Sequence, residues 1–111
     1  MEFEREKSEN ESALIFIDGT ICDDRHRINL YGTADFYNEE NVMNDKPVTG
    51  SVKFVAELAQ RYNIIYIGAR PEDVHTITLK WLHTNGFPEG KVFLATEQSM
   101  RIKIAESSWR F

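Results

Sequence analysis

Three things are scarce in this sequence: cysteine, long apolar stretches and basic residues. The one cysteine, Cys22, cannot form an internal disulfide, which is compatible with a reducing compartment, and we expect the protein in the cytoplasm. The longest apolar runs, 13–17 and 64–67, fall far short of the roughly 20 residues that cross a bilayer. Residues 1–12 contain no apolar stretch of the signal-peptide type. We therefore expect no membrane partner.

The shortage of basic residues argues against nucleic acid as the main partner. The chain has 13 lysines and arginines against 18 aspartates and glutamates, which gives a formal net charge of −5. Because a nucleic-acid backbone is bound by a basic surface, we expect no nucleic-acid partner. One or two local cations would still be enough to bind a small phosphate-containing ligand.

The length of 111 residues fits one domain. Residues 1–11 are highly charged, and we expect them to form a flexible arm. The remainder, 12–111, is expected to be a single domain. It contains a long polar loop or cap insertion, 19–46, with at most a short helix around 34–41; long loops of this kind are often functional. Arg25, His26 and Arg27 form a small basic cluster in this insertion, which we interpret as part of an exposed loop.

Apolar patterning predicts strands that alternate with helices. Continuous apolar runs at 13–17, 64–67 and 92–94 are typical of strands buried on both faces. Helical spacing of apolar residues follows the first two runs, and a last helix is expected at about 99–107. Thr49 is available as the N-cap of the first of these helices. This order predicts an α/β fold with a parallel sheet covered by helices.

Two segments carry a resemblance to a known family. The runs Leu-Ile-Phe-Ile-Asp-Gly-Thr at 14–20 and Ile-Tyr-Ile-Gly-Ala-Arg-Pro at 65–71 are similar to motifs of the haloacid dehalogenase (HAD) superfamily of phosphatases. The resemblance extends from about 13 to 103. It implies a three-layer, Rossmann-like and HAD-like core. Because the family's next strand would follow Phe111, it also implies a core that lacks the last strand or strands of the family.

The first motif of that family places two aspartates around one strand end. The resemblance implies that Asp18 has the position of the general acid and base, and that the Gly19-Thr20 turn lies at the phosphate. The position of the attacking carboxylate is occupied by Phe16, which has no lone pair to attack phosphorus. The sequence therefore resembles a degenerate member of the family.

The other motifs are also incomplete. The resemblance implies phosphate contacts from Gly68, Arg70 and Lys103, but Gly68 stands where the family has a serine or threonine. The acidic pair that holds Mg²⁺ in the family has no counterpart before Phe111, so Asp18 is the one expected metal ligand and its site is incomplete. We expect no cofactor, and Mg²⁺ only if ligands come from elsewhere.

Three functions remain open at this point. We favour a catalytically impaired domain that binds a phosphate or a phosphorylated ligand, and we lean against an enzyme. The first alternative is an active phosphohydrolase with displaced catalytic groups, for which Asp18, Asp23 and Asp24 are the best candidates. The second alternative is a structural or interaction protein that shares the fold. With the family's fourth strand missing, the resemblance also implies that the first strand lies at the sheet edge, where a homodimer or the N-terminal arm would cover it.

Overall fold

The structure is a computed structural model, and it describes residues 11–95 of the chain. The charged arm expected at 1–11 lies outside the described residues except for Glu11. The helix expected at about 99–107 and Lys103 also lie outside them. Residues 11–95 are called the described part of the chain.

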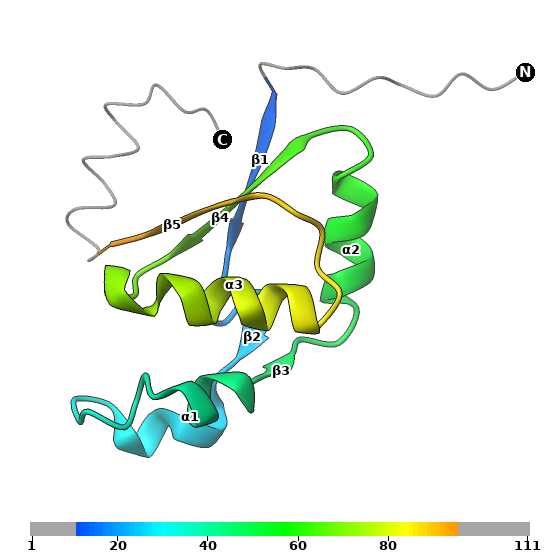
Figure 1. The fold of residues 1–111 in the computed structure, drawn as a ribbon. Coiled ribbons are helices and arrows are strands. Elements are labelled where there is room, and N and C mark those ends of the chain that lie inside the picture. Colours follow the sequence, from blue (N-terminus) through cyan, green and yellow to red (C-terminus); the bar gives the residue numbers. More distant parts are fainter. Residues whose placement is uncertain (1–10, 96–111) are drawn as a thin grey trace, which may run out of the picture.

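Three parallel strands form the central sheet (Figure 1). They are β1 (Ser12–Phe16), β4 (Asn63–Gly68) and β5 (Lys91–Leu94), in the order β1-β4-β5. Ile15 lies beside Tyr66 in the first pair of strands. The predicted strands are confirmed within a few residues, and so is the α/β class with a Rossmann-like core.

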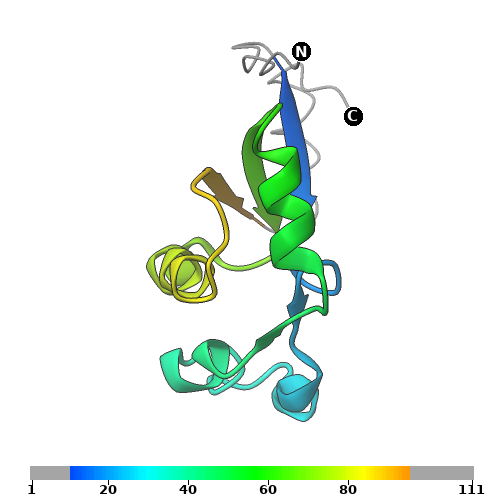
Figure 2. The same ribbon diagram turned by 90° about the vertical axis from the view of Figure 1, so that its right-hand side faces the viewer.

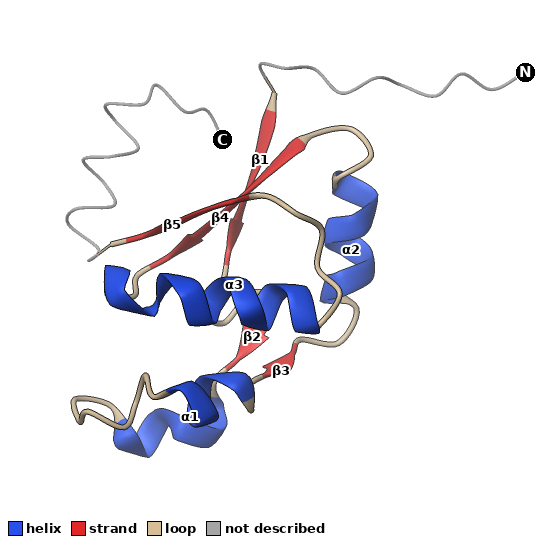
Figure 3. Ribbon diagram, in the orientation of Figure 1, coloured by secondary structure: helices blue, strands red, loops and turns tan. Residues whose placement is uncertain are grey.

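Two of the helices in residues 11–95 cover one face of this sheet. They are α2 (Ser51–Leu58) and α3 (His75–Thr84), which follows a short 3-10 helix, η2 (Glu72–Val74). Figure 3 shows these helices in blue beside the red sheet. Because side chains alternate along a strand, the face toward α2 and α3 receives one set of apolar residues. This core cluster includes Ile15, Ile17, Tyr66, Val55, Trp81, Leu82 and Leu94.

The opposite face of the sheet carries a second, smaller apolar cluster. Ile65, Ile67 and Ala95 are buried there, with Leu14 and Phe93 packed beside them. All five belong to the strands or to the residue that follows β5. Residues 11–95 therefore show two of the three expected layers, the sheet and the helices on one of its faces.

One detail of the helix prediction is wrong. The N-cap of α2 is Gly50, with φ of 82°, and it makes no side-chain capping hydrogen bond; Thr49 is not the cap. A left-handed φ is easily adopted by glycine because it has no Cβ. The start of α2 therefore depends on the left-handed backbone of Gly50 and not on a capping hydroxyl.

The insertion is more ordered than the sequence indicated. It contains a two-stranded antiparallel ribbon of β2 (Cys22–Asp23) and β3 (Lys46–Pro47), a 3-10 helix η1 (Arg25–Leu30) and the short helix α1 (Glu39–Met43). The expected short helix is therefore present but starts later, and η1 was not expected. Figures 1 and 2 place the insertion beyond the carboxyl end of β1, and α1 lies against α3.

None of the helices in residues 11–95 combines the length and the apolar character needed to cross a bilayer.

Candidate functional site

The candidate site starts at the turn that follows β1. Gly19 has φ of 83°, and the Ile17 carbonyl accepts hydrogen bonds from the amides of Thr20, Ile21 and Cys22 at 3.3, 3.0 and 3.0 Å. The Gly19 amide donates to the Cys22 carbonyl at 2.9 Å. The amides of Gly19 and Thr20, expected at a phosphate, are therefore used inside the turn.

Asp18 forms an ion pair with Arg70, the residue expected beside it at the strand ends. Arg70 Nε donates to Asp18 Oδ2 at 2.9 Å and Arg70 Nη2 donates to Asp18 Oδ1 at 2.7 Å. The guanidinium also donates through Nη1 to the Thr78 hydroxyl at 2.9 Å. Arg70 is 1% exposed, whereas the Asp18 side chain is 30% exposed. A bidentate pair of this kind is geometrically specific.

A second ion pair, within the insertion, is more deeply buried than the first. Arg27 donates from Nε and Nη2 to the two carboxylate oxygens of Asp45, both at 2.8 Å, and from Nη1 to the Phe36 carbonyl at 3.0 Å. Its guanidinium carbon also lies 4.5 Å from the centre of the Phe36 ring, a cation–π contact. Arg27 and Asp45 are both buried.

The two pairs form one network. Arg70 Nη2 is 3.8 Å from Asp45 Oδ2, and Arg27 Nη2 is 3.9 Å from Asp18 Oδ1. The Cys22 thiol lies between the carboxylates and donates to Asp45 at 3.1 Å. Two arginines balance two aspartates, which is the condition under which buried charges are tolerated.

Neighbouring residues attach this network to the rest of the domain. His26 Nε2 lies 2.6 Å from Asp45 Oδ1, and the Trp81 indole donates to the Asp45 backbone carbonyl at 2.9 Å. Since Trp81 belongs to α3 and is fully buried, Asp45 connects the insertion to the core by its side chain and by its backbone.

Burial and charge act together on the ionisable groups. Burial raises the pKa of the Cys22 thiol well above its usual range, and the hydrogen bond to Asp45 raises it further. Burial alone would raise the pKa of Asp45, but hydrogen bonds from Arg27, Cys22 and His26 outweigh it and lower that pKa. Burial works against the charge of Arg70, yet Asp18 reverses this effect and raises the Arg70 pKa. The carboxylate and arginines are thus held charged, and the thiol is held neutral.

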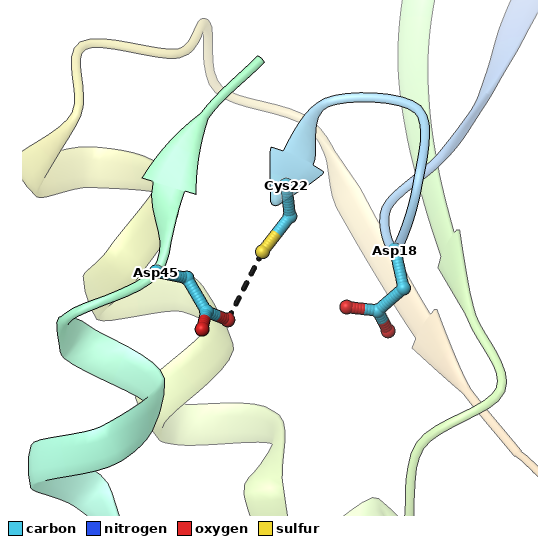
Figure 4. Close-up of side chains that lie close together, drawn as sticks. All are labelled: Asp18, Cys22 and Asp45. Atoms are coloured by element: carbon cyan, nitrogen blue, oxygen red, sulfur yellow. Dashed lines mark hydrogen bonds between the residues drawn. The ribbon is translucent and has the colours of Figure 1, made fainter. Parts of the chain in front are cut away.

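Asp18, Cys22 and Asp45 bring three potential metal ligands within 4.8 Å of one another (Figure 4). This donor set does not fit a divalent ion. Both carboxylates already accept two hydrogen bonds from an arginine, and Cys22 would have to lose a strongly held proton to become a ligand. Two adjacent guanidinium groups would also repel a cation.

The residues expected at the phosphate are only partly brought together. Gly68 lies beside Arg70 at the end of β4, and its surroundings are tight, because a Cβ there would lie 3.0 Å from Leu94 Cδ2. Phe16 is 49% exposed and follows Ile15, which points to the helix-covered face, so its ring points to the other face. Lys103 lies outside the described residues.

The inner half of the network, formed by Arg27 and Asp45, was not predicted from the sequence. His26 and Arg27 were interpreted as part of an exposed loop; for Arg27 this is wrong, and Asp45 was not singled out at all. Thr78 gave a usable signal, since it is a polar residue on the apolar stripe of α3, three residues before Trp81 and four after Val74. No comparable pattern marks Arg27 or Asp45, which are 18 residues apart and meet only in the folded chain.

Asp23 and Asp24, the carboxylates considered as displaced catalytic groups, are partly exposed. Asp23 and Asp24 line a hollow of about 530 Å³ together with Lys46 and Thr49. Asp23 forms a bidentate pair with the exposed Arg25, whose hydrogen bonds lower the Asp23 pKa to about 2. Burial, followed by the charge of Asp18, raises the pKa of Asp24.

Comparison with known proteins corrects the family that the motifs suggested. No curated protein and no solved structure matches the chain. A family model does match: it is described as "PITM 1-3, LNS2 domain" and covers residues 15–106. LNS2 belongs to the Lipin/Ned1/Smp2 family, which is a different family from the one expected, although its fold is itself HAD-like. The correction therefore concerns the family and leaves the fold as predicted, and the chain belongs to the LNS2 domain family of PITM 1-3.

Proposed function

We propose that this HAD-like, phosphatase-related LNS2 domain is a pseudoenzyme, which uses its former catalytic loop as a structural centre. One observation carries the proposal: the Asp18 carboxylate is held by both nitrogens of the Arg70 fork, at 2.7 and 2.9 Å. A general acid and base must exchange protons with the substrate or with water. A carboxylate whose two oxygens accept charged hydrogen bonds from a buried arginine is poorly suited to that task.

The nucleophile position supports the same proposal. Phe16 offers no attacking atom, and Gly68 lacks the hydroxyl that would bind a phosphoryl oxygen. With the carboxylates engaged by arginines, we also expect no resident Mg²⁺. The groups that would neutralise charge in a phosphoryl-transfer reaction are therefore not assembled. Cytoplasm remains the compartment that we expect.

The test is release of the aryl alcohol from a generic aryl phosphate, measured over hours in Mg²⁺ and in chelator. We expect no turnover by the wild type or by Phe16→Asp, because parts of a catalytic unit act together and restoring one seldom restores the whole. Since Phe16 is half exposed, we expect Phe16→Asp to remain folded. A phosphatase activity in either protein that chelator abolishes would contradict the proposal.

The displaced-catalyst alternative has its own control. Asp23→Asn and Asp24→Asn each remove one of the candidate carboxylates that line the hollow. Asp35→Asn is the control, because it removes an exposed carboxylate elsewhere in the insertion. Turnover by the wild type that Asp24→Asn or Asp23→Asn abolishes, and that Asp35→Asn leaves intact, would establish the alternative.

The ligand expected from the sequence is a phosphate group at Asp18, Arg70 and Lys103. Because Arg70 already donates to Asp18 and Thr78, a phosphate must displace the Asp18 carboxylate to reach it. We therefore expect binding in the millimolar range at best, which corresponds to only about 4 kcal/mol.

An NMR titration with inorganic phosphate tests this ligand, with chloride at equal ionic strength as the control. Weak binding should shift the amides of residues 18–20 and 68–71. Asp18→Asn removes the competing carboxylate, so it should strengthen phosphate binding if Arg70 is the cation that holds it. Unchanged amides at high phosphate, in both proteins, would remove the phosphate site.

A further inference from the structure

Two arginines from different parts of the domain lie close to one carboxylate oxygen. Arg70 follows β4 of the core, and Arg27 belongs to η1 of the insertion. Their Nη2 atoms are 2.7 Å and 3.9 Å from the same atom, Asp18 Oδ1. The first distance is that of a hydrogen bond, whereas the second is too long for one. Asp18 therefore binds Arg70 and approaches Arg27 without reaching it.

One donor of Arg27 is not used inside the described part of the chain. Arg27 donates from Nε and Nη2 to Asp45 and from Nη1 to the Phe36 carbonyl. Because each terminal nitrogen of a guanidinium carries two N–H groups, Nη2 keeps a second N–H, for which residues 11–95 provide no hydrogen bond. An acceptor that came closer to Nη2 than Asp18 Oδ1 does could receive it.

Asp18 is also the member of the two ion pairs that solvent reaches. Its side chain is partly exposed, whereas the side chains of Arg27, Arg70 and Asp45 are buried. An anion that enters from solvent must therefore take the place of the Asp18 carboxylate. This exchange preserves the charge balance, because one anion replaces another beside two buried arginines.

The shape of a phosphate group suits both arginines better than a carboxylate does. The two oxygens of a carboxylate lie in one plane with its carbon, and both Asp18 oxygens accept from Arg70. A phosphate group is tetrahedral, so it can offer two oxygens to the fork of Arg70 and direct a third toward Arg27. Planar guanidinium groups are well matched to phosphate in this way.

We propose that Arg27 is a second phosphate-binding residue, so that a phosphate group held by Arg70 is also held by the insertion. This role of Arg27 rests on the phosphate site proposed above at Asp18 and Arg70. The ligand needs at least three unesterified oxygens, so its class is free phosphate or a phosphate monoester. Since Arg27 lies in η1 and Arg70 follows β4, the bound ligand connects the insertion to the core.

NMR signals of the arginine side chains test this role in a protein that keeps Arg27. In Asp18→Asn the competing carboxylate is absent, so a shift of the Arg27 guanidinium on adding phosphate does not come from a departing Asp18. We expect inorganic phosphate to shift the guanidinium signals of Arg70 and Arg27, relative to chloride at equal ionic strength. Arg25 is the matched control, because it lies on the same 3-10 helix and its side chain is 87% exposed; its signal should not move.

A parallel titration with phenyl phosphate distinguishes an esterified ligand from free phosphate. The ester keeps three oxygens, so it should also shift both Arg70 and Arg27. Shifts of both arginines by the ester alone would identify a phosphate monoester as the ligand and would support the role of Arg27 equally.

The affinity for phosphate is the second measurement. Arg27→Lys keeps the positive charge but loses the planar fork. In the Asp18→Asn background it should weaken phosphate binding about tenfold, which corresponds to the loss of one hydrogen bond to a charged group. Arg25→Lys in the same background should leave the affinity unchanged. If Arg27→Lys does not fold, the Arg27 signal in Asp18→Asn decides.

The results separate the role of Arg27 from the phosphate site itself. A shift at Arg70 with none at Arg27, or an unchanged affinity in a folded Arg27→Lys variant, would overturn the role of Arg27 and leave the site at Arg70. No shift at either arginine would remove the phosphate site and the role of Arg27 with it. An equal shift at Arg25 would show a general effect of anions on arginine, and it would also overturn the proposal.

Discussion

At position 68 the chain passes so close to its neighbours that an added side chain would force them to move. A Cβ on Gly68 would lie 3.0 Å from Leu94 Cδ2 and 3.3 Å from Ile17 Cδ1, both in the buried core. A residue with the hydroxyl that a phosphatase of this fold would use could therefore stand here only if these side chains shifted.

Gly68→Ser should consequently destabilise the protein. We expect a loss of about 1–3 kcal/mol in the free energy of unfolding, because overpacking forces neighbouring side chains to shift. Ala69→Ser is the matched control, since Ala69 is the next residue and is exposed; it should stay within about 0.5 kcal/mol. Urea unfolding of both variants gives the comparison, and equal midpoints would show that the core accommodates the added atoms.

At the scale of elements, the insertion is attached to the core by charge as well as by packing. Arg27 of η1 and Asp45, just after α1, meet in a buried pair, and the Asp45 backbone accepts from Trp81 of α3. Arg25 forms a similar bidentate pair with Asp23, two residues earlier in the chain, but its side chain is 87% exposed. The same type of pair therefore occurs buried and exposed on one element.

This contrast predicts very different effects of two equivalent substitutions. Arg27→Met removes the bidentate partner of the buried Asp45 carboxylate and leaves it with His26, Cys22 and the more distant Arg70. We expect this substitution to cost about 3–5 kcal/mol in the free energy of unfolding. Arg25→Met removes an exposed pair and should cost at most about 1 kcal/mol. Urea unfolding measures both, and a similar loss for the two variants would contradict the structural role assigned to Arg27.

The elements also show what a sequence can predict. The strands at 12–16, 63–68 and 91–94 follow from continuous apolar runs, because such runs need burial on both faces. The interior of the insertion does not follow, since its order depends on Arg27 reaching Asp45 across 18 residues. Polar residues give no periodic signal for such a pairing, so the loop was expected to be exposed. For the site, the Asp18 turn and Arg70 were predicted from the sequence. The ion pair between Asp18 and Arg70 became apparent only in the structure.

At the scale of the whole molecule, the buried network makes the stability depend on pH in both directions. The folded-state pKa of Asp45 is lowered, so its contribution is present above the ordinary aspartate pKa of about 3.9 and is lost as pH falls through the folded value. The folded-state pKa of Cys22 is raised, so the unfolded chain releases this proton first as pH rises above about 8.5. The stability should therefore be greatest between these limits.

Urea unfolding at pH 3, 5, 7 and 9.5 measures this profile, each pH being our choice on either side of the limits of about 3.9 and 8.5. We expect similar midpoints at the two central values and lower midpoints at both ends. Above the ordinary thiol pKa, one proton retained by the folded state lowers the free energy of unfolding by about 1.4 kcal/mol per pH unit. Cys22→Ala removes that proton, so it should flatten the alkaline side relative to its own value at pH 7. It should keep the acid loss, which belongs to Asp45 together with the exposed Asp23. An alkaline decline of equal slope in Cys22→Ala would show that another group causes it, and a flat acid side would show that Asp45 is not held charged by its arginine.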